Sequence, residues 1–78
     1  MNAADTLRNV QLVDVLLKQG RARLAKQEAN LLSAEKSNNK RDIFVATTMI
    51  SREKKNIDRL IQDRKELYAQ YDNNREAA

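Results

Sequence analysis

The chain has 78 residues and a net charge of +4; 33% of its residues are charged, 4% are aromatic, and it contains one Gly and no Pro, Cys or His. A chain of this length forms at most one small domain, and a charged, Pro-free composition favours long helices over sheet. Without His or Cys the usual metal ligands, the commonest general base and the thiol nucleophile are missing. We therefore expect the chain to have no catalytic, cofactor or metal site, and we expect that the protein is not an enzyme.

The sequence also carries little that would direct it to or across a membrane. No segment approaches the ~20 apolar residues that span a bilayer. The N-terminal stretch MNAADTLRN has no basic region leading into an apolar one, as a secretory signal would. We expect a cytoplasmic protein with no membrane span.

The first predicted helix covers about residues 4–36. Apolar residues recur every seven positions, and a second, weaker row accompanies them. The rows are Val10, Leu17, Leu24 and Leu31, and Thr6, Val13, Gly20, Gln27 and Ala34. This period is typical of a coiled-coil helix.

A turn is predicted at about residues 37–40, centred on Asn38 and Asn39. The seven-residue row changes phase there: continued from the first helix it reaches Val45, whereas the second row begins at Ile43. A coiled coil tolerates insertions of three or four residues, whereas the step from Asn38 in the first row to Ile43 in the second is five residues. Ser and Asn favour turns, and Asn tolerates the left-handed conformation that ends many helices.

The second predicted helix covers about residues 41–73 and is followed by a frayed C-terminal tail. Asp42 lies in its first turn, where the helix dipole favours an acid, with Asn39 as the predicted cap. Its two rows are Ile43, Ile50, Ile57, Arg64 and Tyr71, and Ala46, Glu53, Leu60 and Leu67.

Folding back at Asn38–Asn39 brings the rows of the two helices together. Facing residue numbers then add up to 77, so that Leu17 meets Leu60 and Gly20 meets Ile57. The predicted fold is an all-α, antiparallel two-helix coiled-coil hairpin forming a single unit over residues 1–78. One thin seam is little core for a small chain, so we expect hairpins to assemble into a four-helix bundle or a helical complex.

Three seam residues are unusual. Gly20 either lets the helices approach closely opposite Ile57 or acts as a hinge. Glu53, opposite Leu24, either fixes the register at a cost in stability or lies at a wet edge. The head of Arg64 is expected to extend to water.

Several apolar residues lie outside the seam, and exposed apolar surface usually marks an interface. We expect this surface to bind a second copy of the chain or a helix of another protein. The predicted interface residues are Leu12, Val15, Leu16, Phe44, Val45, Met49, Ile61 and Tyr68.

Basic residues form a band between the ends of the predicted hairpin, which we call the basic waist. It is a solvated surface, a phosphate site, or a contact for an acidic partner helix. Its members are Lys18, Arg21, Arg23, Lys26, Arg52, Lys54, Lys55 and Arg59.

These patterns favour a non-enzymatic interaction protein, such as an adaptor, assembly factor or chaperone-like subunit. The alternative is a hairpin dimer that binds RNA or DNA through the basic waist and acts as a regulator. Against it stand the nearly balanced charge and the lack of aromatic residues in the waist, since single-strand recognition generally uses stacking. A third hypothesis is a structural coiled-coil segment of a larger assembly. No sequence motif of a known family is matched.

Overall fold

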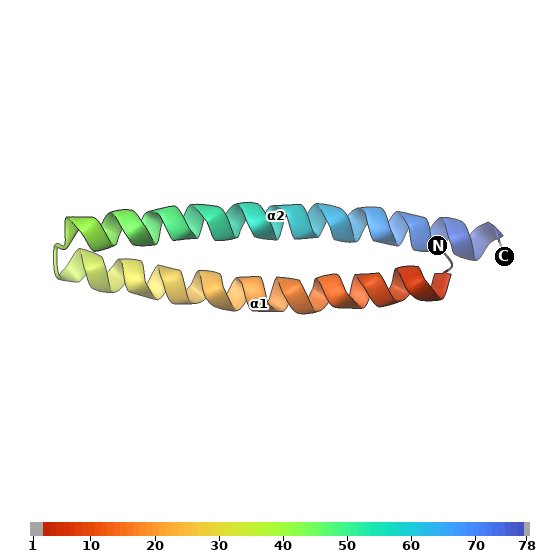
Figure 1. Ribbon diagram of the computed structural model, residues 1–78, viewed down its shortest axis with the longest axis horizontal. Coiled ribbons are helices and arrows are strands. Elements are labelled where there is room, and N and C mark those ends of the chain that lie inside the picture. The colour runs from red at the N-terminus through yellow and green to blue at the C-terminus, as the bar shows by residue number, and fades with distance from the viewer. Residues whose placement is uncertain (1–2, 78) are drawn as a thin grey trace.

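The computed structural model describes residues 3–77, with side chains described for residues 3–73. It consists of helix α1 (Ala3–Lys36) and helix α2 (Lys40–Ala77), which lie side by side and antiparallel (Figure 1). Residues 3–77 contain no strand. The hairpin is a rod of 59 × 14 × 12 Å. We call the end where α1 begins and α2 finishes the open end, and the other the turn end. The predicted all-α hairpin is confirmed.

The connection is made by two Asn residues with different tasks. Asn38 has a φ of 55°, the left-handed conformation that a non-Gly residue rarely adopts and that Asn tolerates best. The backbone N–H of Asn38 donates to the Glu35 carbonyl at 3.1 Å, and the N–H of Asn39 to the Ala34 carbonyl at 3.1 Å. This is the Schellman arrangement, which satisfies the last carbonyls of α1.

Asn39 then starts α2. Its side-chain Oδ1 accepts a hydrogen bond from the backbone N–H of Asp42 at 3.1 Å, which is the contact of an N-cap residue with the third residue of its helix. Asp42 lies in the first turn, where an acid is stabilised by the helix dipole. The predicted cap is confirmed.

Helix α2 is longer than the sequence suggested. We expected it to end at about residue 73 with a frayed tail, but it continues to Ala77. The stretch after Tyr71 contains neither Pro nor Gly, so no residue forces an end there. The side chains of residues 74–78 lie outside the described part.

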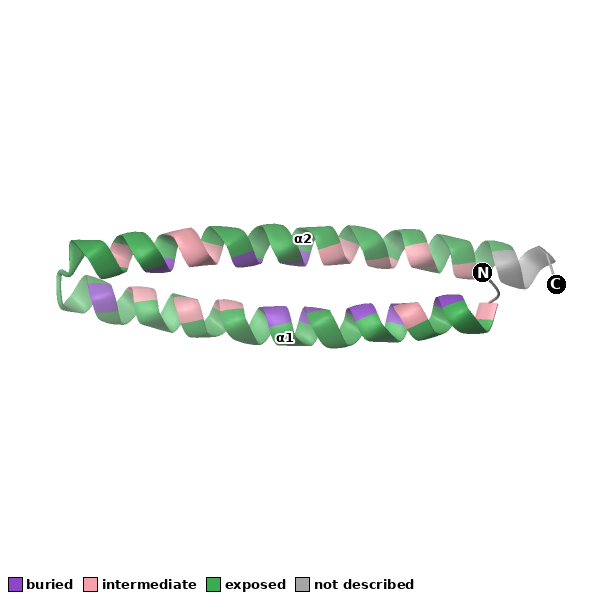
Figure 2. Cartoon of the chain, in the orientation of Figure 1, coloured by how far each residue is buried: buried purple, intermediate pink, exposed green. Residues whose placement is uncertain are grey.

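The predicted seam is the buried part of the hairpin. Each residue of the four seven-residue rows is buried or half-buried, and buried positions follow the inner edges of both helices (Figure 2). The apolar centre consists of Val13, Leu17 and Ile57. Leu24, Leu60, Ile61 and Leu67 pack against it.

Gly20 is buried in an unbroken α1 and lies against Ile57. A Cβ added to Gly20 would lie 3.4 Å from Ile57 Cγ1, at the limit of ordinary contact. The helices therefore approach closely at this point, as the packing interpretation of Gly20 predicted. A hinge is not needed to explain it.

Neither α1 nor α2, within the described residues, includes a stretch both long and apolar enough to cross a lipid bilayer.

Candidate protein-binding faces

The seam leaves a broad face on each side of the plane that contains the two helix axes. Residues spaced by three, four and seven share one side of a helix, and contacts between the helices show which sides adjoin. We name each face after one of its residues. The Tyr68 face contains Leu7, Asp14, Lys18, Arg21 and Leu32 of α1 and Lys40, Phe44, Thr47, Lys54, Asp58, Ile61, Lys65, Tyr68 and Asp72 of α2. The Arg23 face contains Asn9, Leu12, Leu16, Arg23, Lys26, Asn30, Ser33 and Ser37 of α1 and Asp42, Val45, Met49, Arg52, Arg59, Asp63, Glu66 and Gln70 of α2.

An ionic contact crosses the seam on the Tyr68 face. Arg64 Nε lies 2.6 Å from Asp14 Oδ1, and the Arg64 guanidinium lies over the Tyr68 ring, with Cζ 5.1 Å from the ring centroid. The Nε atom is shielded from solvent and the Asp14 carboxylate is its charge partner. Arg64 therefore extends along the side of the rod between two partners, in addition to reaching water as predicted. About half of this ion pair is exposed, with side-chain exposures of 42% and 45%, so its contribution to stability is small.

The Arg23 face is tied across the seam by a different ion pair. Glu53 is 9% exposed, and the Arg23 Nε–H donates to its Oε1 at 3.3 Å and its Oε2 at 3.4 Å. The interpretation of Glu53 as a wet-edge residue is therefore wrong. Arg23 covers the carboxylate from the solvent side, with its own side chain 54% exposed.

Two shallow grooves of about 290 Å³ lie along the Arg23 face. The turn-end groove is mostly polar, with Asn30, Ser33, Ser37 and Asp42 around Val45. The open-end groove combines an apolar floor with acids. Its lining residues are Asn9, Leu12, Asp63, Glu66, Leu67 and Gln70.

The predicted interface residues do not form one surface. Six of them are exposed large side chains, namely Leu12, Val15, Leu16, Phe44, Val45 and Tyr68, with 72% exposure at Phe44 and 57% at Leu12. Met49 and Ile61 are only half-buried, and Ile61 also packs against the seam. Leu12, Leu16, Val45 and Met49 lie on the Arg23 face, Phe44, Ile61 and Tyr68 on the Tyr68 face, and Val15 on the outer edge of α1.

Two further exposed apolar residues belong to the Tyr68 face. Leu32 is 62% exposed and Leu7 is 39% exposed. The signal for Leu32 was its position directly after the seam residue Leu31, because adjacent helical residues point about 100° apart and only one of them can face the partner helix.

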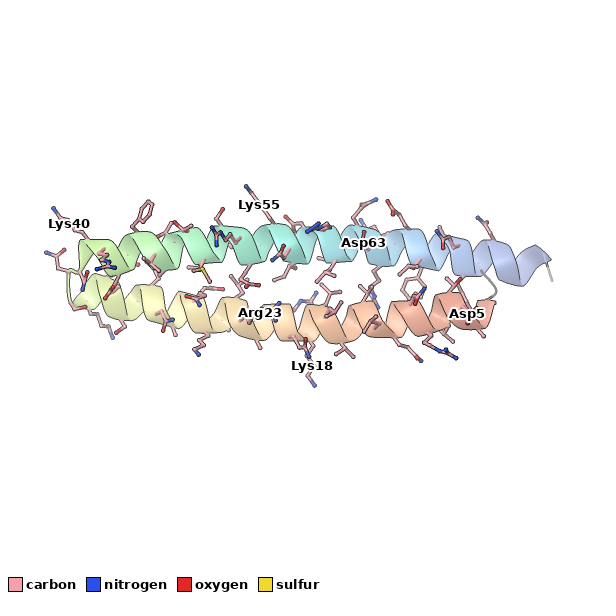
Figure 3. All side chains as sticks on the ribbon, viewed as in Figure 1. Asp5, Lys18, Arg23, Lys40, Lys55 and Asp63 are labelled. Carbon is pink, nitrogen blue, oxygen red and sulfur yellow. The ribbon has the colours of Figure 1, made fainter. Side chains whose placement is uncertain are left out.

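The basic waist is divided between the two faces and the outer edges. All eight of its residues are exposed. Lys55 lies on the outer edge of α2, and Lys18 extends from α1 on the opposite side of the rod (Figure 3). Arg23, Lys26, Arg52 and Arg59 belong to the Arg23 face, and Lys18, Arg21 and Lys54 to the Tyr68 face. The waist is therefore a belt around the rod.

No protein family, curated protein or solved structure matches this chain.

Proposed function

We propose that this protein is a non-enzymatic helical interaction protein that acts by helix-on-helix association with a second copy of itself or with a helix of another protein. An adaptor, an assembly factor and a chaperone-like subunit all work in this way. The observation that carries the proposal is the set of large apolar side chains left exposed by the finished hairpin. They are Leu7, Leu12, Val15, Leu16, Leu32, Phe44, Val45 and Tyr68.

Exposed apolar residues scattered singly are normal on a protein surface. Here they recur on faces that run the length of a rod only 14 Å wide, and two of the most exposed, Leu32 and Phe44, lie on the same face near the turn end. A helix laid along such a face would remove several of them from water together. Burial of each large apolar side chain contributes roughly 1.5–3 kcal/mol.

The thinness of the core supports the same proposal. Many of the large apolar seam residues are only half-buried, among them Leu24, Leu31, Ile43, Ile50, Leu60 and Leu67. A small scaffold with no disulfide and a single seam gains little net stability from its own core. Packing against another helix would complete the burial of these residues.

The test is sedimentation of the purified chain over a hundredfold dilution, alongside its thermal unfolding. An associating hairpin is expected to show a mass above that of one chain and a melting temperature that rises with concentration. The double variant Leu16→Asp/Phe44→Asp, which places a charge on both faces, is expected to remain monomeric. A chain that is monomeric throughout, melts independently of concentration and binds no helical protein would contradict the proposal.

A further inference from the structure

We propose that the Tyr68 face binds the Tyr68 face of a second copy in antiparallel orientation. The two-fold axis lies between the two faces, runs perpendicular to the rod, and passes α2 at the level of Asn56. The proposal rests on the proposed function, because it names the partner and the register of that association. In this dimer α2 lies against α2 of the second copy and α1 against α1, which gives a four-helix bundle.

A two-fold interface must be self-complementary, since a contact from residue i to residue j is repeated from j to i. The Tyr68 face has this property because its exposed large apolar residues lie toward its two ends. Leu7 and Tyr68 lie at the open end, and Leu32 and Phe44 at the turn end. An antiparallel arrangement places the open end of one copy against the turn end of the other.

The apolar residues of α2 set the register. With Phe44 opposite Tyr68 of the second copy, the symmetry axis crosses α2 at Asn56, midway between them. The symmetric contact, Tyr68 with Phe44 of the second copy, follows automatically. This pairing removes from water the most exposed of the large apolar side chains among residues 3–73, Phe44 at 72%, together with the 40% exposed Tyr68.

The same register pairs opposite charges along α2. Lys54 falls opposite Asp58 of the second copy, and Lys40 opposite Asp72. All four side chains are exposed in the hairpin, so each is free to turn toward a second copy. Each pair forms twice in the dimer, which gives the α2 contact charge complementarity on both sides of the axis.

Helix α1 provides an independent check. Pairing its two exposed leucines, Leu7 with Leu32 of the second copy, places the axis on α1 between Gln19 and Gly20. Gly20 faces Ile57 within the hairpin, so this crossing point is less than two residues, about 2 Å, from the level of Asn56 on α2. Pairings derived separately on the two helices thus require the same axis.

One contact opposes the arrangement. The register brings Lys18 opposite Arg21 of the second copy, a like-charge pair on α1. A parallel dimer would avoid it and would pair Leu7 with Tyr68, Leu32 with Phe44 and Lys18 with Asp58. However, it would offer one ion pair where the antiparallel register offers two, and it would place Arg21 opposite Lys54 and Asp14 against Ile61, a like-charge pair and a carboxylate on an apolar residue. The antiparallel dimer has the better match.

The face is large enough for a stable dimer. The extents of 59 by 14 Å outline a face of about 800 Å² in projection, which is of the same order as the accessible area that each partner buries in a standard-size protein interface. The apolar contacts lie toward the ends, the ion pair of Lys54 with Asp58 lies beside the axis, and the ion pair of Lys40 with Asp72 lies at the ends.

Cross-linking of engineered cysteines tests the register, because the natural chain contains none. In the proposed dimer Thr47 lies opposite Lys65 of the second copy, and both are exposed. Within one chain they are 18 residues apart on α2, about 27 Å, beyond the reach of a short bis-maleimide. The double variant Thr47→Cys/Lys65→Cys is expected to become mostly covalent dimer when treated with this reagent.

Three variants serve as controls. The single variants Thr47→Cys and Lys65→Cys should stay uncross-linked, because each residue lies about 27 Å from its own copy in the second chain. Arg52→Cys/Gln70→Cys has the same 18-residue spacing on the Arg23 face and should also stay uncross-linked. Circular dichroism checks that all variants are folded.

The outcomes separate this inference from the proposed function. A wild-type chain that sediments as a dimer, combined with no cross-linking of Thr47→Cys/Lys65→Cys above the single variants, would overturn the antiparallel register and leave association standing. Cross-linking of Arg52→Cys/Gln70→Cys instead would overturn the choice of face. A monomer that binds a helical protein would overturn self-association but not the proposed function.

Discussion

The two faces of the hairpin are made of similar residues arranged differently. On the Tyr68 face, the exposed large apolar side chains lie toward both ends, and charges of both signs lie between and beyond them. On the Arg23 face, the charges are segregated, with Arg23, Lys26, Arg52 and Arg59 around the middle and Asp63 and Glu66 beside the open-end groove. The order of residues along a face, more than its composition, decides whether it can match itself. The exposed apolar residues of the Tyr68 face and the charges of its α2 side are arranged symmetrically about its centre, whereas the charges of the Arg23 face are not.

The largest effect is expected from adjacent substitutions on the two faces. Phe44→Asp should weaken self-association by at least about 30-fold in Kd, because loss of a buried aromatic interface anchor costs about 2 kcal/mol or more and the contact of Phe44 with Tyr68 forms twice in the dimer. Val45→Asp, one residue away and on the Arg23 face, should change Kd by less than about threefold. Analytical ultracentrifugation measures both. Equal effects of the two substitutions would remove the distinction between the faces.

A substitution in the seam should damage both faces alike, since both rest on the same two helices. Gly20→Leu is expected to lower the free energy of unfolding by about 1–3 kcal/mol, because a large side chain cannot fit against Ile57. Gly20→Ala is the matched control. Its Cβ fits at ordinary contact distance from Ile57 Cγ1, 3.4 Å, and helix propensity favours Ala by up to about 1 kcal/mol. Urea denaturation measures both changes in the free energy of unfolding, and we expect Gly20→Leu to lower it and Gly20→Ala to raise it.

The turn should likewise influence both faces equally. Asn39→Ala removes the side-chain acceptor for the Asp42 N–H and should lower the free energy of unfolding by about 1 kcal/mol. Asn38→Gly should be neutral or stabilising, because Gly adopts a positive φ without steric cost. Thermal unfolding at one fixed concentration gives the comparison. A destabilised Asn38→Gly variant would contradict this account of the turn.

The smallest effect concerns the ion pair that distinguishes the Arg23 face. Arg23→Ala leaves the Glu53 carboxylate without its partner, and we expect a loss of about 0.5–1 kcal/mol in unfolding free energy, reduced because Arg23 is itself largely exposed. Arg21→Ala, which removes an exposed charge of the Tyr68 face, should cost less than about 0.5 kcal/mol. Chemical denaturation at low and high salt measures both. A larger loss of unfolding free energy for Arg21→Ala than for Arg23→Ala would contradict the stabilising role assigned to the ion pair of Arg23 with Glu53.

The sequence was sufficient for the hairpin because its signals are local or periodic. The seven-residue rows identified each seam position, and the Asn pair at 38–39 identified the turn and the cap. The end of α2 was missed, since a helix end without Pro or Gly leaves no clear signal. The basic waist was predicted only from the shared position of its residues along the length of the rod, and the sequence did not show that they are divided between its two faces. Distance comes directly from the 1.5 Å rise per residue, whereas the side of the rod depends on the angle around each helix.

By itself, then, the sequence determined where the helices begin and turn, which residues lie in the seam, and which apolar residues are left over. Only the tertiary structure decided how those residues divide between the two faces, that Glu53 is covered by Arg23, and that Arg64 lies between Asp14 and Tyr68. The reason is physical. Periodicity fixes a residue's position on its own helix, but contacts across the seam depend on how closely two helices approach and how far long side chains reach between them.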